Sequence, residues 1–519
     1  LASVTYVGAS GGNWSNANNW AGGAIPTYSR EGSVNNVATV IIPIGSNVKF
    51  DYPNLINFTS VNSRTDIIPT SAITNNGTLS FEGSADFTLS NLVSGTGQID
   101  HSGGGNLTLS NANTYSGGTN IHGSHLTLSN ANALGTGTLT SNGGTLSVAN
   151  NVTLPSLTVN GAINLDTNIL TTGTQTYNGA VTIDGGSVLN PLQIKTQNSD
   201  IVFNGTINGT SSSFTNQTSL KVDAGTANVT FNDAVGWNNW LNVPYSYNLL
   251  VGSSSLYQLE VDANTIMINA NMTTFDKQNY YGAVVIGNNG TNGTTRRLLS
   301  EDPEILFNST VDDQTANTND LIVMAISAAG GGTPSITFNG NVGANKALKS
   351  LIVSTGVQNP VEVFTDISQN QNGYVGTIAL ANGVSVTTFG NQVYNSTSIP
   401  VNNTNTFNTS PGYTVQFNSG VSALPYNSNS FNTSTQVTQN YNGIPNVNNN
   451  NGNNTPSVIN DNYVRFIGSD HFDRDFKVYF ETLRNNLPYL ADVTVGDIET
   501  VQLKNECGDK NDKACVKQI

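Results

Sequence analysis

Short runs of alternating apolar and polar residues recur along most of the chain, each bounded by Gly or Asn. They include NGTLSFEG (from residue 76), GNLTLSNAN, SHLTLSNAN, GTLTSNGG and GTLSVANN. A two-residue alternation predicts β-strands with one buried face, and Gly or Asn at both ends predicts tight turns. We therefore expect an all-β chain.

One of these runs is repeated. LTLSNAN occurs at 107–113 and again at 126–132. A period near twenty residues indicates stacked coils, one turn of chain per repeat. Alternate residues then point inward, while Asn and Thr point outward or form ladders on neighbouring coils. The expected fold is a right-handed parallel β-helix (β-solenoid) with loop insertions, and its inward residues here are Leu107, Leu109, Leu126 and Leu128.

A second type of repeat places Phe-Asn at the end of an apolar strand. It occurs in DIVFNGTING (200–209), ANVTFNDAVG (227–236), PEILFNSTVD (303–312) and PSITFNGNVG (334–343). Its irregular spacing predicts loop insertions, and we interpret residues 237–300 as one such excursion. We expect four rings to stack in register inside the solenoid: Phe203, Phe231, Phe307 and Phe338.

Composition divides the chain into four segments. Residues 1–50 form a Trp-containing β segment, and residues 51–439 form the solenoid. Residues 440–456 are an Asn-rich linker. Residues 457–519 carry much of the charge, show helical apolar spacing over 469–491 and end in a cysteine pair, so we expect a small α+β anchor region there.

The first segment holds two tryptophans, Trp14 and Trp20, among Gly, Asn and Ser residues. They precede the strand-like run VATVIIPIGSNVKF. Two interpretations are open: a platform that binds a sugar, or a cap on the open end of the β core. We favour the cap, because the exposed end of a solenoid needs covering.

The charge of the chain limits the classes of molecule that it can bind. Charged residues make up 10% of the chain, the net charge is −15 and the pI is about 4.5. An acidic chain without basic stripes is a poor nucleic-acid binder, because phosphate contacts need clustered Lys and Arg. Arg296-Arg297 lies in a Gly/Asn/Thr stretch, which we interpret as a solvated turn or protease-sensitive site. No run approaches the ~20 apolar residues of a membrane helix.

Candidate catalytic chemistry is sparse. His122 and His125 could meet on one coil face, but no carboxylate or Cys is near them in sequence, so we expect no metal there. Asp312-Asp313 and the run 301–304 place acidic residues in apparent loops, where solvation or a Ca²⁺ contact is favoured over the acid–base pair of a glycan lyase. No hydrolase, metalloprotease or phosphate-loop motif occurs. We expect no enzyme, and no cofactor apart from that Ca²⁺.

Asn-x-Ser/Thr triplets are abundant. In a chain rich in Asn and Thr many arise by chance, and the alternative is glycosylation of the asparagine. The candidate positions are Asn76, Asn106, Asn204, Asn208 and Asn228.

Three stretches resemble known families. LVSGTGQIDHSGGGNLTLSNANTYSGGTNIHGSHLTLSNANALGTGTL (92–139) resembles the passenger-associated β-strand repeat of autotransporter adhesins. The FNGxVG-type coils are similar to those of filamentous-haemagglutinin-like large exoproteins. The terminal NECGDKNDKACVKQI resembles the C-terminal cysteine loop of two-partner-secretion adhesins, including the high-molecular-weight type. A disulfide between Cys507 and Cys515 is favoured over a pair of metal ligands.

The resemblance implies a secreted adhesin stalk on a bacterial surface that attaches to host cells or other bacteria through a host-cell or glycan receptor. It further implies that the cysteine loop holds the protein at an outer-membrane two-partner-secretion transporter. No N-terminal secretion domain or C-terminal translocator is visible, so we expect the C-terminal part of a longer exoprotein. Two alternatives remain: a self-associating fibre or biofilm-matrix protein, and a β-helix polysaccharide lyase or hydrolase.

Overall fold

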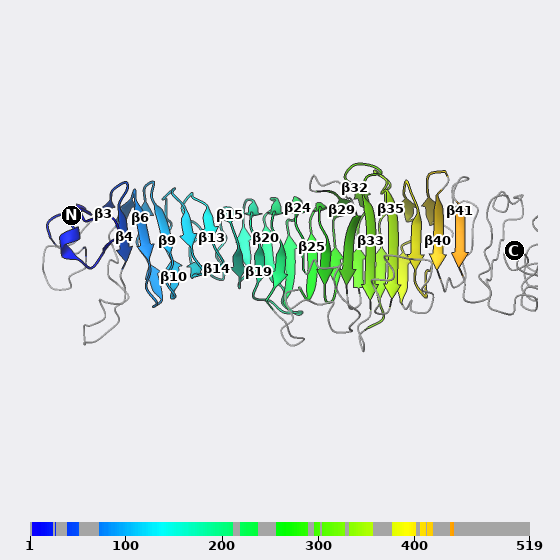
Figure 1. Ribbon diagram of the computed structural model, residues 1–519, viewed down its shortest axis with the longest axis horizontal. Coiled ribbons are helices and arrows are strands. Elements are labelled where there is room, and N and C mark those ends of the chain that lie inside the picture. The colour runs from blue at the N-terminus through cyan, green and yellow to red at the C-terminus, as the bar shows by residue number, and fades with distance from the viewer. Residues whose placement is uncertain are drawn as a thin grey trace, which may run out of the picture. The chain divides into compact units, whose positions relative to one another are not determined.

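The computed structural model consists almost wholly of β-strands (Figure 1), which confirms the all-β prediction for the residues it describes. These residues are 3–23, 26, 39–50, 72–210, 218–236, 256–288, 295–300, 304–326, 332–356, 376–400, 405–411, 413–418 and 436–440. The only helix among them is a 3-10 turn, η1 (Ala17–Asn19). The chain divides into an N-terminal unit (Leu1–Asn242 and Asn248–Gly282) and a C-terminal unit (Val243–Tyr247 and Ala283–Ile519).

The N-terminal unit contains four parallel sheets, each named here after one member. The β3 sheet contains β1 (Ser3–Thr5), β3 (Thr39–Ile42), β5 (Ala72–Asn75) and β8 (Val93–Ser94). The β6 sheet contains β2 (Gly12–Asn13), β4 (Asn47–Phe50), β6 (Thr78–Phe81), β9 (Gln98–His101), β11 (Thr119–Ile121), β13 (Leu139–Ser141), β15 (Leu157–Asn160), β18 (Gln175–Tyr177), β21 (Ile201–Phe203), β24 (Asn228–Phe231) and β26 (Thr265–Ile268).

The other two sheets of this unit are also parallel. The β10 sheet contains β7 (Phe87–Leu89), β10 (Asn106–Leu109), β12 (His125–Leu128), β14 (Gly144–Val148), β16 (Ile163–Leu165), β19 (Val181–Ile183) and β22 (Ile207–Gly209). Single bridges from Ile207 to Val235 and on to Met272 connect it to β27 (Met272–Thr274). The β20 sheet contains β17 (Ile169–Thr171), β20 (Leu192–Thr196), β23 (Ser219–Asp223), β25 (Gln258–Asp262) and β28 (Gln278–Tyr280).

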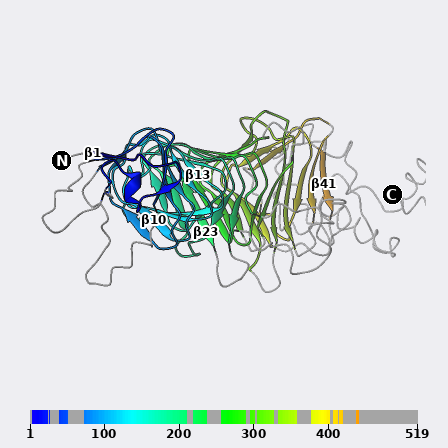
Figure 2. The same ribbon diagram turned by 60° about the vertical axis from the view of Figure 1, so that its left-hand side comes forward.

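The chain visits these sheets in a fixed order. From β15 onward it passes through the β6, β10 and β20 sheets in turn and then returns to the first, as in β15–β16–β17, β18–β19–β20 and β21–β22–β23. Successive strands of one sheet therefore come from successive passes of the chain. Figure 2 shows this stacking from a second direction, around the labelled β10, β13 and β23.

Pairing follows the repeat that the sequence predicts. Leu107 pairs with Leu126 and with Phe87, so one pass takes 19 or 20 residues here. The side chains of Leu107, Leu109, Leu126 and Leu128 are buried, as expected. Their neighbours Thr108 and Thr127 are partly exposed, because alternate side chains of a strand point to opposite faces. Packing of Leu against Leu from pass to pass forms the core.

Turns between strands require glycine where passes approach closely. At Gly97 a Cβ atom would lie 2.2 Å from the carbonyl oxygen of Gly77, one pass earlier, which no side chain can tolerate. Gly95 has φ +99°, a backbone conformation that favours glycine. The alternation of Gly-rich turns and short apolar strands thus follows from the close spacing of the passes.

The C-terminal unit is built in the same way. One group of strands contains β29 (Ala283–Ile286), β32 (Val311–Asp313), β37 (Ser385–Thr387) and β39 (Thr406–Asn408). A second contains β30 (Thr295–Ser300), β33 (Asp320–Ile326), β35 (Ser350–Gly356), β38 (Gln392–Asn395), β40 (Thr414–Asn418) and β41 (Gln436–Asn440). A third contains β31 (Glu304–Phe307), β34 (Ser335–Phe338) and β36 (Thr377–Leu380).

Two predictions need correction. The four phenylalanines do not form one stack: Phe203 pairs with Phe231 in the N-terminal unit, and Phe307 pairs with Phe338 in the C-terminal unit. The ring centroids are 5.4 Å apart in the first pair and 4.9 Å apart in the second. After Phe231 the ladder continues with Ile268, because the next strand lacks the Phe-Asn motif.

Residues 237–300 are not a single excursion. Residues 256–288 and 295–300 form six strands, β25 to β30, that follow the alternation of their neighbours. Their buried apolar positions are filled by Leu, Val, Ile, Met and Tyr, so a search for the Phe-Asn motif does not find these strands. The anchor region 457–519, and the linker 440–456 beyond its first residue, lie outside the described residues.

Candidate functional site

Trp14 and Trp20 lie in an aromatic cluster at the N-terminal end of the β6 sheet. Both side chains are only 1% exposed. The indoles meet edge to face at 4.6 Å between centroids, Tyr6 packs against Trp20, and Phe50 of β4 packs against Trp14. The indole NH of Trp20 donates to the carbonyl oxygen of Trp14 at 2.8 Å. Neither indole presents an open face to a sugar, so the platform interpretation does not fit this packing.

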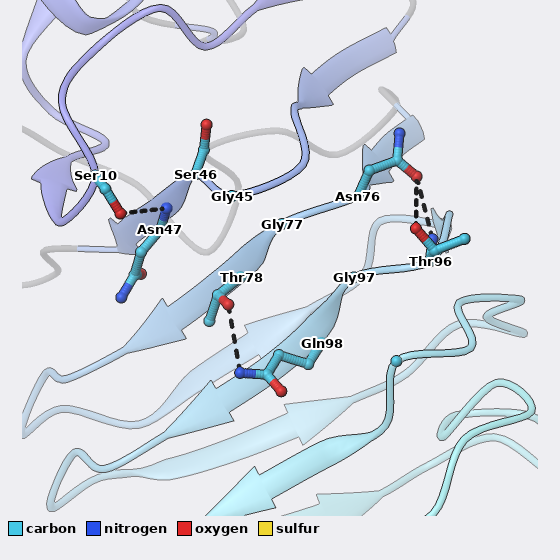
Figure 3. A pocket seen from close by; sticks show the side chains of 11 residues that line it. Ser10, Gly45, Ser46, Asn47, Asn76, Gly77, Thr78, Thr96, Gly97 and Gln98 are labelled. Carbon is cyan, nitrogen blue, oxygen red and sulfur yellow. Dashed lines mark hydrogen bonds between the residues drawn. The ribbon is translucent and has the colours of Figure 1, made fainter.

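A shallow groove of about 380 Å³ opens beside this cluster, where turns lead into β4, β6 and β9 (Figure 3). Only Gly, Ser, Thr, Asn and Gln line it. The backbone NH of Asn47 donates to the hydroxyl of Ser10 at 3.2 Å. The side-chain oxygen of Asn76 accepts from the backbone NH of Thr96 at 3.1 Å. These bonds join turns from separate passes into one polar surface.

The groove retains donors for a ligand. The side-chain oxygens of Asn47 and Asn76 already accept hydrogen bonds, from Ser80 and from Thr96, but among the described residues their side-chain nitrogens donate none. Figure 3 shows both side chains at the groove. No lining residue carries a charge and none is aromatic. Such a surface can hydrogen-bond a neutral, hydroxyl-rich molecule such as a glycan, and it offers no group for acid–base chemistry.

The acidic pair Asp312-Asp313 is not in a loop, contrary to our expectation. Both residues belong to β32 and are buried. Asp312 accepts from the backbone NH groups of Asn345 and Lys346, at 2.9 and 3.2 Å. Asp313 accepts from the backbone NH groups of Thr318 and Asn319, both at 2.9 Å. The carboxylates thus fasten two turns, and neither is open to a polysaccharide or to Ca²⁺.

Both histidines contact carboxylates that lie far from them in the sequence. His122 lies 2.9 Å from Asp100, and His125 lies 3.5 Å from Asp166. Asp100 comes from the pass next to His122, and Asp166 comes from the second pass after His125, so the two histidines belong to different contacts. Among the described residues no group of three or more His, Cys, Asp or Glu could hold a metal ion.

Arg296-Arg297 is not a solvated turn. Both residues lie in β30, and the Arg296 side chain is buried, with its Nε donating to the carbonyl oxygen of Gly287 at 2.8 Å. Burial lowers the pKa of both guanidinium groups. The apolar residues that follow this pair, Leu298 and Leu299, extend it into a strand, which explains the wrong expectation.

The candidate glycosylation sites differ in what their side-chain nitrogens bind. That of Asn204 donates to Asn178 at 2.7 Å, and that of Asn228 lies 3.3 Å from Asp200. That of Asn106 donates to Thr108 at 3.4 Å, and that of Asn208 to Thr206 at 3.5 Å. Asn76 alone among the five makes no such bond within the described residues.

The functional assignments at the C-terminus remain predictions, because Cys507 and Cys515 lie outside the described residues. Among the described residues no helix is both long enough and apolar enough to cross a membrane. No known protein-family model matches the chain, no curated protein is similar to it, and no solved structure matches its fold.

Proposed function

We propose that the protein is an exported adhesin stalk on a bacterial surface, built as a right-handed β-solenoid. The supporting observation is the fixed order in which the chain visits three parallel sheets, with in-register pairing such as Leu107 to Leu126 and Leu126 to Leu146. A chain that returns to each sheet once per pass grows by one strand spacing, about 4.8 Å, each time. Such growth extends a binding surface away from its anchor.

The solenoid can be tested with pairs of cysteines. Thr176 of β18 pairs with Val202 of β21, and both side chains face outward. Thr176→Cys with Val202→Cys should form a disulfide readily, because neighbouring strands place the Cα atoms within bonding range. Thr176→Cys with Thr182→Cys, on the β10 sheet, is the control and should not. Equal crosslinking of both pairs would contradict the coil.

Adhesion is tested separately. Beads coated with the whole chain should bind cultured epithelial cells saturably, and free chain should compete. Binding no greater than that of beads coated with an unrelated acidic protein would reject the adhesin proposal and leave the solenoid standing.

The groove is the proposed contact for a neutral glycan, because its lining is uncharged and the side-chain NH2 groups of Asn47 and Asn76 donate no hydrogen bond among the described residues. Replacing both Asn47 and Asn76 by Ala should lower bead binding severalfold. Asn164→Ala, on the β10 sheet, is the matched control because Asn164 is outward-facing and lies far from the groove lining in sequence. Unchanged binding by the double variant would exclude the groove.

Surface retention is proposed to depend on the C-terminal cysteine loop. Replacing Cys507 and Cys515 by Ser should release the protein into the medium. Unchanged retention of this variant at the cell surface would reject the tether.

A further inference from the structure

One buried polar network occurs three times in the described chain. Its sequence is Thr-x-(Gly/Asp)-x-Gln-x-Tyr, found at 171–177, 274–280 and 388–394. The Thr, Gln and Tyr side chains are all buried in each copy. Polar side chains in a core made mainly of Leu, Ile, Val and Phe need an explanation, because burying a polar group is unfavourable unless it is hydrogen-bonded.

The first copy is fully connected. The hydroxyl of Thr171 donates to the carbonyl oxygen of Gly173 at 2.5 Å. Gln175 donates from Nε2 to Thr171 Oγ1 at 3.2 Å and to the carbonyl oxygen of Lys195 at 2.8 Å. The hydroxyl of Tyr177 donates to Gln175 Oε1 at 2.7 Å. Both ends of the Gln amide are therefore occupied.

The second copy repeats this geometry. The hydroxyl of Thr274 donates to the carbonyl oxygen of Asp276 at 2.7 Å. Nε2 of Gln278 donates to Thr274 Oγ1 at 3.2 Å, and the hydroxyl of Tyr280 donates to Gln278 Oε1 at 2.9 Å. Asp can take the place of Gly because the network uses only the backbone oxygen of this position; the Asp276 carboxylate accepts separately from Gln258.

The third copy, in the C-terminal unit, is again the same. The hydroxyl of Thr388 donates to the carbonyl oxygen of Gly390 at 2.6 Å. Gln392 donates to Thr388 Oγ1 at 3.2 Å and to the carbonyl oxygen of Asn408 at 2.8 Å. The hydroxyl of Tyr394 donates to Gln392 Oε1 at 3.0 Å.

The copies lie at different corners. In the N-terminal unit, the first leads from β17 of the β20 sheet into β18 of the β6 sheet. The second leads from β27, which is bridged to the β10 sheet, into β28 of the β20 sheet. The geometry therefore belongs to the seven-residue motif and not to one corner of the fold.

The network also reaches the next pass of the chain. Lys195, whose carbonyl oxygen accepts from Gln175, lies in β20, the strand that pairs with β17. Asn408, whose carbonyl oxygen accepts from Gln392, lies in β39, the strand that pairs with β37. In these two copies the Gln amide thus bonds both its own pass and the following one.

The apolar ladders do not distinguish one pass of the chain from another in this way. In the β20 sheet Ile169 pairs with Ile194, Ile194 with Val222, and Val222 with Val261. Side chains so alike would pack almost as well if a strand skipped one pass, and register is weakly specified where neighbours are interchangeable. A buried polar network, in contrast, leaves its members unpaired when the wrong pass is opposite.

We propose that the networks of the first and third copies are register locks, which fix which pass of the chain pairs with which. The proposal depends on parallel pairing alone and stands whether or not the protein is an adhesin. It accounts for why Gln and Tyr occupy core positions that Leu and Phe could fill, since a buried polar group contributes specificity even where an apolar one would contribute equal stability.

The test replaces the first lock with apolar residues of similar shape in the full chain: Thr171→Val, Gln175→Leu and Tyr177→Phe together. Register is reported by outward cysteine pairs on the β6 sheet. Thr176→Cys with Val202→Cys reports the native pairing, and Thr176→Cys with Thr230→Cys reports a pairing that skips one pass. Each pair is placed in the chain with and without the lock.

Without the lock, crosslinking of the skipped pair should increase roughly tenfold, the change that about 1.4 kcal/mol of register preference produces. Ile183→Val, a core change in β19 of the β10 sheet and outside any lock, is the control and should leave crosslinking of the skipped pair unchanged. Native crosslinking only, together with a lower melting temperature, would overturn the proposal and make the network an ordinary stabilising contact. If the triple variant does not fold, Tyr177→Phe alone carries the same test with the same two outcomes.

Discussion

The side-chain amide of Asn204 donates a hydrogen bond to the side-chain oxygen of Asn178, 2.7 Å away. The relationship continues in both directions: Asn178 donates to Asn160 at 2.8 Å, Asn232 to Asn204 at 2.7 Å and Asn269 to Asn232 at 2.7 Å. Five successive strands of the β6 sheet thus end in one ladder of amides. The spacing of paired strands matches the reach of an Asn side chain, as it does in stacked amide ladders generally.

The ladder predicts that interior members matter more than its first member. Asn204→Ala removes two amide hydrogen bonds and should lower local stability by roughly 1–3 kcal/mol, while Asn160→Ala removes one and should cost about half as much. Hydrogen exchange of the β21 and β24 amides measures this difference. Equal protection in the two variants would mean that the ladder adds nothing to the backbone pairing.

The same ladder predicts which asparagine accepts a sugar. The side-chain nitrogen of Asn204 is occupied within the ladder, whereas that of Asn76 makes no hydrogen bond among the described residues. An N-glycosyltransferase acting on the folded chain should therefore modify Asn76 before Asn204. Glycopeptide mapping reads the site directly. Sugar on Asn204 with none on Asn76 would contradict this order, and an intact mass equal to the bare polypeptide would reject modification at both sites.

The repeating architecture was accessible from sequence because it depends on local patterns. Alternation predicted the buried Leu107 and Leu126, and the repeated LTLSNAN predicted their pairing one pass apart. Each signal needs only the residues of one strand and its turn. The strands β25 to β30 were missed because we expected the Phe-Asn motif to recur, although the fold requires only an apolar residue at that position.

The buried polar groups could not be predicted in the same way. Residue type alone places Gln175 and Asp313 outside, yet they are 0% and 1% exposed. One partner of Gln175 is the carbonyl oxygen of Lys195, which becomes its neighbour only when two passes pair, and the partners of Asp313 are NH groups of the turn that follows it. The recurrence of Thr-x-(Gly/Asp)-x-Gln-x-Tyr was a usable signal for the burial of Gln175. Nothing comparable marks Asp313, which occurs in a single turn.

Asp313 should be a structural residue with a large effect. Asp313→Ala leaves the backbone NH groups of Thr318 and Asn319 without their acceptor in a buried position, so we expect a loss of roughly 3 kcal/mol. Asp233→Ala is the control, because Asp233 is exposed and bonds only the neighbouring NH of Ala234. Urea unfolding, monitored by far-UV circular dichroism, gives the unfolding midpoints of the two variants. Similar midpoints would contradict the role assigned to Asp313.

The aromatic cluster predicts that the stability of the protein depends strongly on the size of the side chain at position 14. Trp14→Ala opens a cavity next to Trp20 and Phe50 and should cost about 3–5 kcal/mol. Trp14→Phe should cost distinctly less, because it keeps a ring in place and removes an indole NH that has no partner among the described residues. Thermal unfolding, monitored by near-UV circular dichroism, would distinguish the stabilities of the two variants. Equal losses would show that the indole shape, and not ring packing, determines stability at this end.

Buried tyrosines predict how the fold responds to alkali. Burial raises the pKa of Tyr115 and Tyr177 well above the ordinary value near 10. Below that value both states hold the phenolic proton and this contribution to stability is intact. As pH rises further, the unfolded chain ionises first, so stability falls until the raised pKa is reached.

Replacing Tyr115 by Phe should therefore flatten the loss of stability above pH 10 by up to about 1.4 kcal/mol per pH unit, the value of one proton. At neutral pH the same variant should be slightly weaker, because the hydroxyl contact with Thr119, 2.5 Å long, is lost. Thr119→Val supplies the control, since it removes the same hydroxyl contact but keeps the phenol, and it should leave the slope of the parent unchanged. Urea midpoints measured between pH 8 and pH 12 give both slopes. A Tyr115→Phe slope identical to that of the parent would mean that this phenol ionises without unfolding.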